Sequence, residues 1–342
     1  MGRAFFSSIC LLLLAPAALG WTVEEEKRMG RRIDEEIRRA FVVLDDPSFR
    51  SAFDLVLSRF EPHLRRPYLE YSGGLIRDDR VNAFALPGGR IYLTTGMRDF
   101  LRSKHELAAL LGHEVAHVDM SHHRRVYQRS RDLLLPNLLV AVLTRGSAPA
   151  MLVADLVSTG AINRYGKDLE READAVGVEL VHRAGFEPVG ALTTLERLWG
   201  YQLQRPRPEL GVYATHPELE ERIAHVGRRI SELGLRVRRK SAVPILVPSL
   251  ELEGGEWSLK VDGSEVLRLP EASRDLADSA FAVLLELELE MEPYEVEASG
   301  PNLTLWGRPA LDLGDPALAS LFRDNIRRAL SRAYLEQPRV WR

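Results

Sequence analysis

Cysteine is almost missing from this chain of 342 residues, because Cys10 is the only one. It lies in an N-terminal apolar run that we expect to be cleaved off, so the mature chain would contain no thiol. A disulfide framework, a cysteine-ligated metal site and thiol catalysis are therefore excluded for the mature protein.

A large excess of one charge is missing as well. The chain has 46 Lys and Arg against 49 Asp and Glu, for a net charge of −3. This balance gives no reason to expect nucleic acid as a partner. The sequence also lacks a G-x-S-x-G motif and a glycine-rich phosphate-binding loop, so serine-hydrolase and phosphoryl-transfer chemistry have no support.

Long hydrophobic runs are few, and the first lies at the N-terminus. Arg3 precedes an apolar stretch that ends at Gly20, with small residues at Ala18 and Gly20. This pattern is typical of a signal peptide over residues 1–20, cleaved before Trp21. We therefore expect a periplasmic or secreted protein. An uncleaved membrane anchor at residues 4–20 is the less favoured alternative.

A second apolar region extends over residues 133–162, where only Arg145 and Asp155 are charged. Neither half reaches the ~18 residues that a membrane span requires. Three interpretations stay open for it: buried core helices, a lid over the active site, or an element in peripheral contact with a membrane.

The chain is long enough for two domains, which we place at 21–240 and 241–342. In the first, residues 22–62 read as helix, and two strands flanking Pro87-Gly88-Gly89 predict a hairpin. Helices are also predicted over about 167–184, ending at Gly185, and from Pro188 to about Leu233.

The second domain follows a basic stretch at 236–240. A hairpin is predicted around Asp262-Gly263, and a terminal helix is predicted after Asp315-Pro316. Alternation of leucine and glutamate from Leu285 to Met291 predicts a strand with one acidic face. These elements indicate a small α/β accessory domain of unknown role.

The most informative motif is His113-Glu114-Val115-Ala116-His117, within a helical pattern that starts near residue 104 after a Ser103/Glu106 capping signal. Histidines four apart on a helix point the same way and can bind one metal ion. Glu114 lies next to them as a candidate general base.

A metal ion held by two histidines is expected to have a third protein ligand. Glu170 and Asp174 share one face of the 167–184 helix, whereas Glu172 points roughly opposite. One of the two carboxylates would bind the metal, and the other would orient a ligand histidine. Spacing alone leaves their roles open. Gly177 continues the same face and would allow a neighbouring helix to approach closely.

The chain resembles the BepA/HtpX/Oma-type zinc metallopeptidases, peptidase family M48, over residues about 22–230. Short sequence segments that occur in the same order as in the family carry the resemblance. One mild departure is Gly166-Lys167, which stands before the acidic motif where the family usually has Ser-Arg. The matching pieces are Asn82-Ala83-Phe84-Ala85-Leu86-Pro87-Gly88-Gly89, Thr95-Gly96-Met97, the 113–117 motif, Glu170-Arg171-Glu172-Ala173-Asp174, Thr215-His216-Pro217 and Glu221-Arg222-Ile223.

The resemblance implies an α+β fold: a mainly helical gluzincin-type metallopeptidase domain with a small antiparallel sheet. It implies one Zn²⁺ per chain held by His113, His117 and Glu170, with Asp174 as the partner of a ligand. His216 and Arg222 match the family's downstream pair, which would hold an oxyanion. The alternative role for His216 is to occupy the open position of the zinc and keep the enzyme latent. The other histidines, His122 and His123 among them, are expected to be surface or packing residues.

The predicted function is a zinc metalloendopeptidase that cleaves unfolded or misassembled envelope proteins, as the resemblance implies. An extended substrate would add as a strand to the hairpin edge at Asn82, Ala83, Phe84 and Ala85. Outer-membrane assembly machinery is a possible partner. The alternative is a chaperone or assembly factor whose zinc site is latent or structural, an interpretation that the acidic accessory domain favours.

Overall fold

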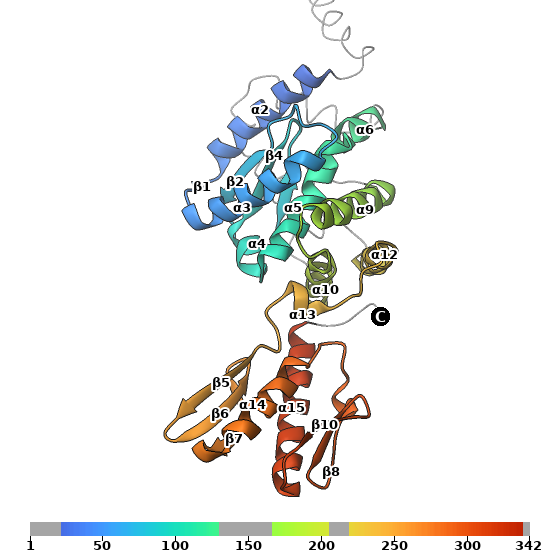
Figure 1. Cartoon of the computed structure of the whole chain (residues 1–342). Helices are drawn as coiled ribbons and strands as arrows, with labels where there is room; N and C mark the ends of the chain where they lie inside the picture. The colour runs from blue at the N-terminus through green and yellow to red at the C-terminus, as the bar shows by residue number, and fades with distance from the viewer. Residues whose placement is uncertain (1–21, 130–165, 205–218, 338–342) are drawn as a thin grey trace, which may run out of the picture.

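The computed structural model describes residues 22–129, 166–204 and 219–337 (Figure 1). The expected signal peptide, the apolar region 133–162 and His216 lie outside these residues. Two units follow one another along the chain, and each has its own hydrophobic core. The larger core draws on residues up to Ala242, and the C-terminal core begins at Val243.

The N-terminal unit is mainly helical, as predicted, with a small sheet on one side (Figure 1). Its strands are β1 (Val43–Leu44), β2 (Ser72–Ile76), β3 (Ala83–Ala85) and β4 (Arg90–Thr94). Its helices are α2 (Val23–Ala40), α3 (Pro47–Phe60), α4 (Thr95–Phe100), α5 (Lys104–Asp119), α6 (His122–Arg129), α9 (Lys167–Arg183), α10 (Val189–Gln204), α12 (Leu219–Glu232) and α13 (Arg239–Ala242), with a short 3₁₀ turn at Glu61–His63.

The sheet has the strand order β1-β2-β4-β3, so β3 lies at one edge. β3 and β4 pair antiparallel across the glycine turn, which confirms the predicted hairpin. β2 pairs with β4 in parallel, because the chain passes from β2 to the edge strand before it turns back into β4. The sheet is therefore mixed rather than purely antiparallel.

Residues 22–62 are largely helical, as predicted, but they form two helices with β1 between them. α2 ends at Ala40, and β1 then pairs with β2. Asp46 caps the second helix by accepting a hydrogen bond from Phe49 N at 3.0 Å, and Pro47 occupies its first turn. Proline at that position lacks only an amide hydrogen that a helix start leaves unpaired, so it begins a helix rather than continuing one.

Helices α5 and α9 cross at two glycines. A Cβ added to Gly177 would lie 3.0 Å from Gly112 C and 3.0 Å from His113 N. A side chain there would push α9 away from α5, so the absence of a side chain sets the distance between the helices. The close approach predicted for Gly177 is confirmed, and it falls beside the first motif histidine.

The C-terminal unit has two three-stranded sheets that accompany helices α14 and α15 (Figure 1). Its terminal helix begins after the Asp315 cap, as predicted, and the predicted hairpin forms between β6 and β7. The elements are β5 (Pro248–Glu253), β6 (Glu256–Val261), β7 (Ser264–Pro270), α14 (Arg274–Leu285), β8 (Val296–Ser299), β9 (Asn302–Leu305), β10 (Arg308–Asp312) and α15 (Pro316–Glu336), with 3₁₀ turns at Glu271–Ser273 and Pro293–Glu295.

The predicted acidic strand at 285–291 is wrong. Leu285 is the last residue of α14, and the following residues form turns. Leu287, Leu289 and Met291 are nevertheless buried in the C-terminal core. An irregular segment can thus satisfy an alternating pattern when every second side chain reaches the core, so the pattern did not require a strand.

Arg239 joins the two units. Its guanidinium donates from Nε to Glu196 Oε2 at 2.8 Å and from Nη2 to Glu196 Oε1 at 2.6 Å, on α10. Its Nη1 donates to Glu290 Oε1 at 3.0 Å, in the segment after α14. Gln337, just beyond α15, donates to Thr193 O at 3.0 Å. The C-terminal unit is therefore bonded directly to α10.

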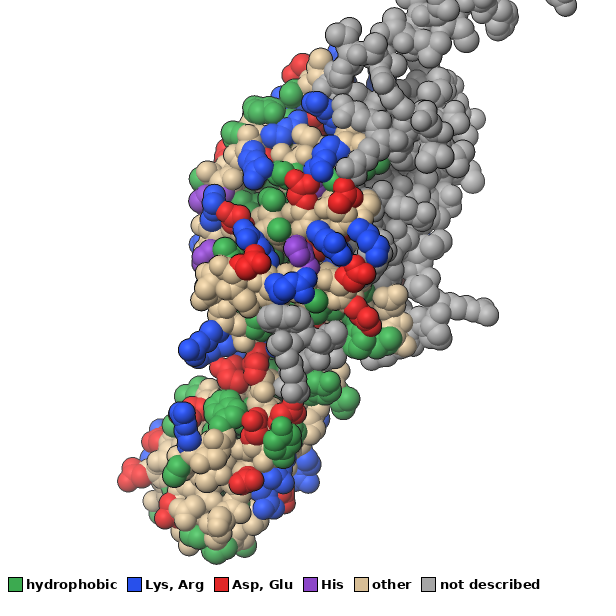
Figure 2. All heavy atoms as spheres, turned by 90° about the vertical axis from the view of Figure 1, so that its right-hand side faces the viewer, with side chains coloured by type: hydrophobic (Ala, Val, Ile, Leu, Met, Phe, Trp, Pro, Cys, Tyr) green, Lys and Arg blue, Asp and Glu red, His purple; other side chains and the backbone are tan. Residues whose placement is uncertain are grey.

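Positively and negatively charged side chains are interspersed on the face of the molecule that Figure 2 shows.

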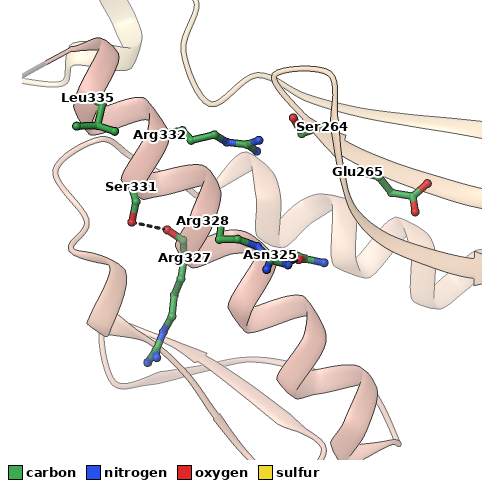
Figure 3. Close-up of a pocket in the computed structure, with 8 residues that line it drawn as sticks. All are labelled: Ser264, Glu265, Asn325, Arg327, Arg328, Ser331, Arg332 and Leu335. Atoms are coloured by element: carbon green, nitrogen blue, oxygen red, sulfur yellow. Dashed lines mark hydrogen bonds between the residues drawn. The ribbon is translucent and has the colours of Figure 1, made fainter.

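A hollow of about 440 Å³ in the C-terminal unit lies between the start of β7 and α15 (Figure 3). Arg327, Arg328 and Arg332 line it, and Ser331 on its rim donates a hydrogen bond to Arg327 O. Among the described helices, none combines the length and apolar character that crossing a membrane would need.

Candidate active site

Helix α5 carries the motif and starts where the sequence placed it. Ser103 Oγ accepts a hydrogen bond from Glu106 N at 3.1 Å. Glu106 does not return the bond to Ser103 but accepts from Arg102 N at 2.8 Å. Two residues of α10 donate hydrogen bonds to Glu106 Oε1. Thr193 donates from Oγ1 at 2.8 Å, and Arg197 donates from Nη1 at 3.1 Å. The start of the motif helix is thereby fixed to α10.

His113, His117 and Glu170 meet at one point between α5 and α9. The two Nε2 atoms lie 3.1 Å apart. Glu170 Oε2 lies 3.5 Å from His113 Nε2, and Glu170 Oε1 lies 3.6 Å from His117 Nε2. All three residues are buried. Of the two carboxylates that spacing left open, Glu170 is the one that faces both imidazoles.

This donor set fits a divalent metal ion. The three residues each offer one ligand atom within 4.8 Å of the others. Two nitrogen ligands at ~2.0–2.1 Å from a tetrahedral zinc would lie roughly 3.3 Å apart, close to the observed 3.1 Å. Two imidazoles and one carboxylate are also a ligand set that zinc uses when its fourth position serves catalysis.

Asp174 orients the first histidine from the opposite side. Its Oδ1 lies 3.0 Å from His113 Nδ1. Burial opposes ionisation of Asp174, but the charge and hydrogen bonds of Arg222 outweigh it and lower its pKa to about 2. Burial and Arg222 likewise oppose protonation of His113, yet hydrogen bonds to Asp174 and Glu170 raise its pKa to about 9.

Arg222 reaches this cluster from α12. Its guanidinium donates to Asp174 from Nε at 2.8 Å and from Nη2 at 2.6 Å, and its Nη1 lies 3.3 Å from Glu170 Oε2. It is buried. The structure thus brings Arg222 together with the motif, and it compensates two buried carboxylates. Its predicted partner His216 lies outside the described residues.

His122 is a buried residue, so of the two places predicted for it, surface or packing, the surface is excluded. Its side chain is fully buried, and its Nδ1 lies 2.9 Å from His117 Nδ1. Its Nε2 lies 3.4 Å from Glu172 Oε2. Burial lowers its pKa to about 4. The motif thus has a third histidine, and a histidine five positions after His117 was the available sequence signal.

Glu114 and a small cavity lie on one side of the cluster. The Glu114 side chain is buried at 1% exposure. The cavity measures about 40 Å³, and its wall includes His113, Glu114 and Arg222 together with α10 residues. A water molecule needs roughly 10–15 Å³ of such space, so solvent fits beside Glu114.

The predicted substrate strand lies next to α5. β3 is at the sheet edge and packs against the motif helix. Asn82, Ala83, Phe84 and Ala85 are all buried, with 3% exposure or less. Ala85 O lies 3.0 Å from His123 Nε2. The strand has the position that strand addition needs, although its residues are covered in this conformation.

A helix that carries two histidines with a glutamate next to the first of them, crossed by a second helix that carries a carboxylate, is the arrangement of a metallohydrolase site. The model of peptidase family M48 matches residues 55–230, which is just over half of the chain. The chain therefore belongs to this family of metal-dependent peptidases.

Curated relatives agree with this assignment. The beta-barrel assembly-enhancing protease of Escherichia coli K12 is 28% identical over 220 residues, which cover 62% of this chain and 45% of that protein. The mitochondrial metalloendopeptidase OMA1 of Schizosaccharomyces pombe is 27% identical over 224 residues, 65% of either chain. The metalloprotease LoiP of Escherichia coli K12 is 28% identical over 160 residues, 46% of this chain and 61% of that protein. The chain spans about half the length of the first of these relatives.

Proposed function

We propose that this protein is a zinc metalloendopeptidase with one Zn²⁺ per chain, held by His113, His117 and Glu170. The observation that carries the proposal is the convergence of these three buried ligand atoms within 4.8 Å. Residues 21–240 would form the peptidase domain and 241–342 an accessory domain. The separate hydrophobic cores of the two units support this division.

A zinc ion held there would supply Lewis acidity toward a water molecule and a peptide carbonyl. Glu114 follows His113 directly in the helix and lines the same cavity. It would take a proton from the attacking water and deliver it to the departing amine. Arg222, beside the same cavity, would place positive charge near the developing oxyanion, and His216 would assist it. Asp174 would hold the His113 ring in position.

Substrates would bind as extended strands along β3, at Asn82, Ala83, Phe84 and Ala85. Main-chain pairing gives affinity with little sequence preference, which suits unfolded or misassembled envelope proteins. The expected signal peptide would place the enzyme in the periplasm or outside the cell. The first relative's name, a protease that enhances β-barrel assembly, supports outer-membrane assembly machinery as a partner.

Metal analysis and a casein-cleavage assay on residues 21–342 test the proposal. We expect one zinc per chain and cleavage by the unaltered protein. Glu114→Gln should retain the zinc and lose cleavage, because the amide cannot accept the proton. Cleavage that survives in this variant would refute Glu114 as the base. Zinc that survives in both His113→Ala and Glu170→Ala would refute the metal site.

A second candidate function is a chaperone or assembly factor with a latent or structural zinc site. Two observations favour it: the residues of β3 are covered, and the cavity of about 40 Å³ has no room for a peptide residue. Stoichiometric zinc without cleavage, unaltered by His216→Ala, would support this function. Cleavage that appears only in His216→Ala would instead show a latent peptidase.

A further inference from the structure

A line of buried and half-buried polar groups leads away from the second motif histidine. His117 Nδ1 lies 2.9 Å from His122 Nδ1, and His122 Nε2 lies 3.4 Å from Glu172 Oε2. Glu172 in turn accepts from Arg125 Nη1 at 2.5 Å. His117 comes from α5, His122 and Arg125 from α6, and Glu172 from α9. Three helices therefore meet in one line of polar contacts.

A break between α5 and α6 makes this contact possible. Residues five apart in a continuous helix lie roughly 140° apart around the axis and cannot face each other. Here α5 ends at Asp119, and Ser121 adopts a left-handed φ of 57°. A left-handed residue that is not glycine costs free energy and persists where its surroundings require it. The turn folds the start of α6 back so that His122 reaches His117.

The facing nitrogens fix the direction of the hydrogen bonds. His117 Nε2 points at His113 and Glu170, so a metal ion held there would take its lone pair. The proton of the His117 ring must then be on Nδ1, which lies 2.9 Å from His122 Nδ1 and can donate to it. The His122 proton is consequently on Nε2, which faces the Glu172 carboxylate. Each group has one consistent role.

We propose that His122 is a positioning residue for the metal ligand His117, and that Glu172, held by Arg125, sets the tautomer of His122. This inference rests on the metal site of the proposed function. Helix α9 would then contribute to the metal site in three different ways within the five residues 170–174. Glu170 would bind the metal, Asp174 would orient His113 directly, and Glu172 would orient His117 through His122.

The inference explains why α6 begins where it does. Metal-ligand histidines usually donate their second ring proton to a carboxylate, a backbone carbonyl or a water. For His113 that acceptor is the Asp174 carboxylate at 3.0 Å. Glu172 contacts His122 and Arg125 instead of His117, so the neutral imidazole of His122 fills the gap between His117 and a charge. The position between His117 and Glu172 therefore requires a side chain of about the size of an imidazole, with a hydrogen-bond acceptor on the side that faces His117.

The experiment measures zinc affinity by competition with a chromogenic chelator, using the full mature chain. His122→Leu fills the space without an acceptor and should weaken zinc binding by ~10–100-fold, the usual effect of losing such a partner. His122→Asn keeps an acceptor oxygen close to the position of Nδ1 and should recover most of that loss. His123→Leu is the matched control, because His123 contacts Ala85 O rather than His117, and its zinc affinity should equal that of the unaltered protein.

A second pair of variants keeps the test informative if His122→Leu fails to fold. Glu172 is half-buried, so Glu172→Gln is expected to fold normally. It should weaken zinc binding several-fold, whereas Glu179→Gln should not, because this half-buried glutamate of the same helix pairs with Arg183 and Arg229 instead. Cobalt provides a spectroscopic measure: the visible bands of the Co²⁺ protein should shift in His122→Leu and return in His122→Asn, because they depend on the orientation of the ligand rings.

The outcomes separate this inference from the proposed function. Equal zinc affinity in His122→Leu, Glu172→Gln and the unaltered protein would overturn the inference alone, provided that His113→Ala still loses the metal. An equal loss in His122→Leu and His122→Asn would also overturn it, because packing rather than the hydrogen bond would then be responsible. Loss of zinc in His122→Leu with recovery in His122→Asn is the supporting result.

Discussion

Arg222 and Asp174 form a buried, two-pronged ion pair between α12 and α9, with nitrogen–oxygen distances of 2.8 and 2.6 Å. The same guanidinium lies 3.3 Å from Glu170 Oε2. One cation therefore compensates the proposed ligand carboxylate and the carboxylate that orients His113. Two acids can be buried side by side here because an arginine from a third helix lies between them.

Removing this arginine should destabilise the protein strongly. Arg222→Ala removes the guanidinium that both buried carboxylates contact and leaves His113 beside them, which we expect to lower the free energy of unfolding by about 3–5 kcal/mol. Arg222→Lys should recover little, since lysine cannot reproduce the planar two-pronged geometry. The measurement is urea unfolding of the metal-free protein. Arg228→Ala is the control, an exposed arginine on the same helix. Equal losses in the two alanine variants would contradict this account.

Replacing Asp174 should weaken metal binding without removing a ligand. Asp174→Asn keeps the shape and one acceptor oxygen, but it loses the charge that holds His113 and Arg222. We expect zinc affinity to fall by ~10–100-fold. Competition with a chelator gives the measurement. Asp168→Asn, an exposed change on the same helix, should leave the affinity unaltered. An unchanged affinity in Asp174→Asn would show that the His113 contact has no role in holding the metal.

The sequence was sufficient to predict the convergence of α5 and α9, for a physical reason. Histidines four apart must share a helix face, and Gly177 indicated where a second helix could approach. Both are properties of regular helices, which spacing describes well. The choice between Glu170 and Asp174 was different, because both lie on one face of α9. Only the family resemblance favoured Glu170, and in the structure this carboxylate faces both imidazoles.

His122 could not be predicted in the same way. Its contact with His117 depends on the left-handed turn at Ser121, and helical periodicity would have placed it on another face. The segment 285–291 shows the opposite error. Its alternation was real, since Leu287, Leu289 and Met291 are buried, but periodicity reports burial and not hydrogen bonding. The His117–His122 contact and the conformation of 285–291 were both unpredicted for the same reason, because each lies in irregular backbone that periodicity does not describe.

The contact between the units should support α10 and, through it, the cavity wall. Arg239 is buried and pairs with Glu196 on α10, while Thr194, Leu195 and Leu198 of the same helix line the cavity. Arg239→Met removes the guanidinium that donates to both carboxylate oxygens of Glu196. We expect a loss of ~3–5 kcal/mol in the free energy of unfolding and a rise in KM for casein.

Two further variants check this interpretation by urea unfolding. Glu196→Leu combined with Arg239→Met should recover part of the stability, because the buried carboxylate that lost its arginine partner is then removed as well. Arg238→Met, at the exposed neighbouring residue, should change neither stability nor KM. If the double variant is no more stable than Arg239→Met, the loss would be due to packing and not to an unpaired charge.

Glu288 should make the stability of the protein depend on pH in an unusual direction. Burial and the nearby Glu290 raise its pKa above the ordinary value of 4.5, although Lys240 and Arg238 oppose them. A carboxyl whose pKa is raised by folding binds its proton more tightly in the folded state, so its ionised form destabilises the fold. Its contribution should therefore improve as the pH falls through the raised pKa toward 4.5. We expect Glu288→Gln to raise the Tm at pH 7–8 and to give a smaller gain near pH 5. Glu286→Gln is the exposed control and should show neither effect. A gain for Glu288→Gln that is the same at every pH would contradict the assigned cause.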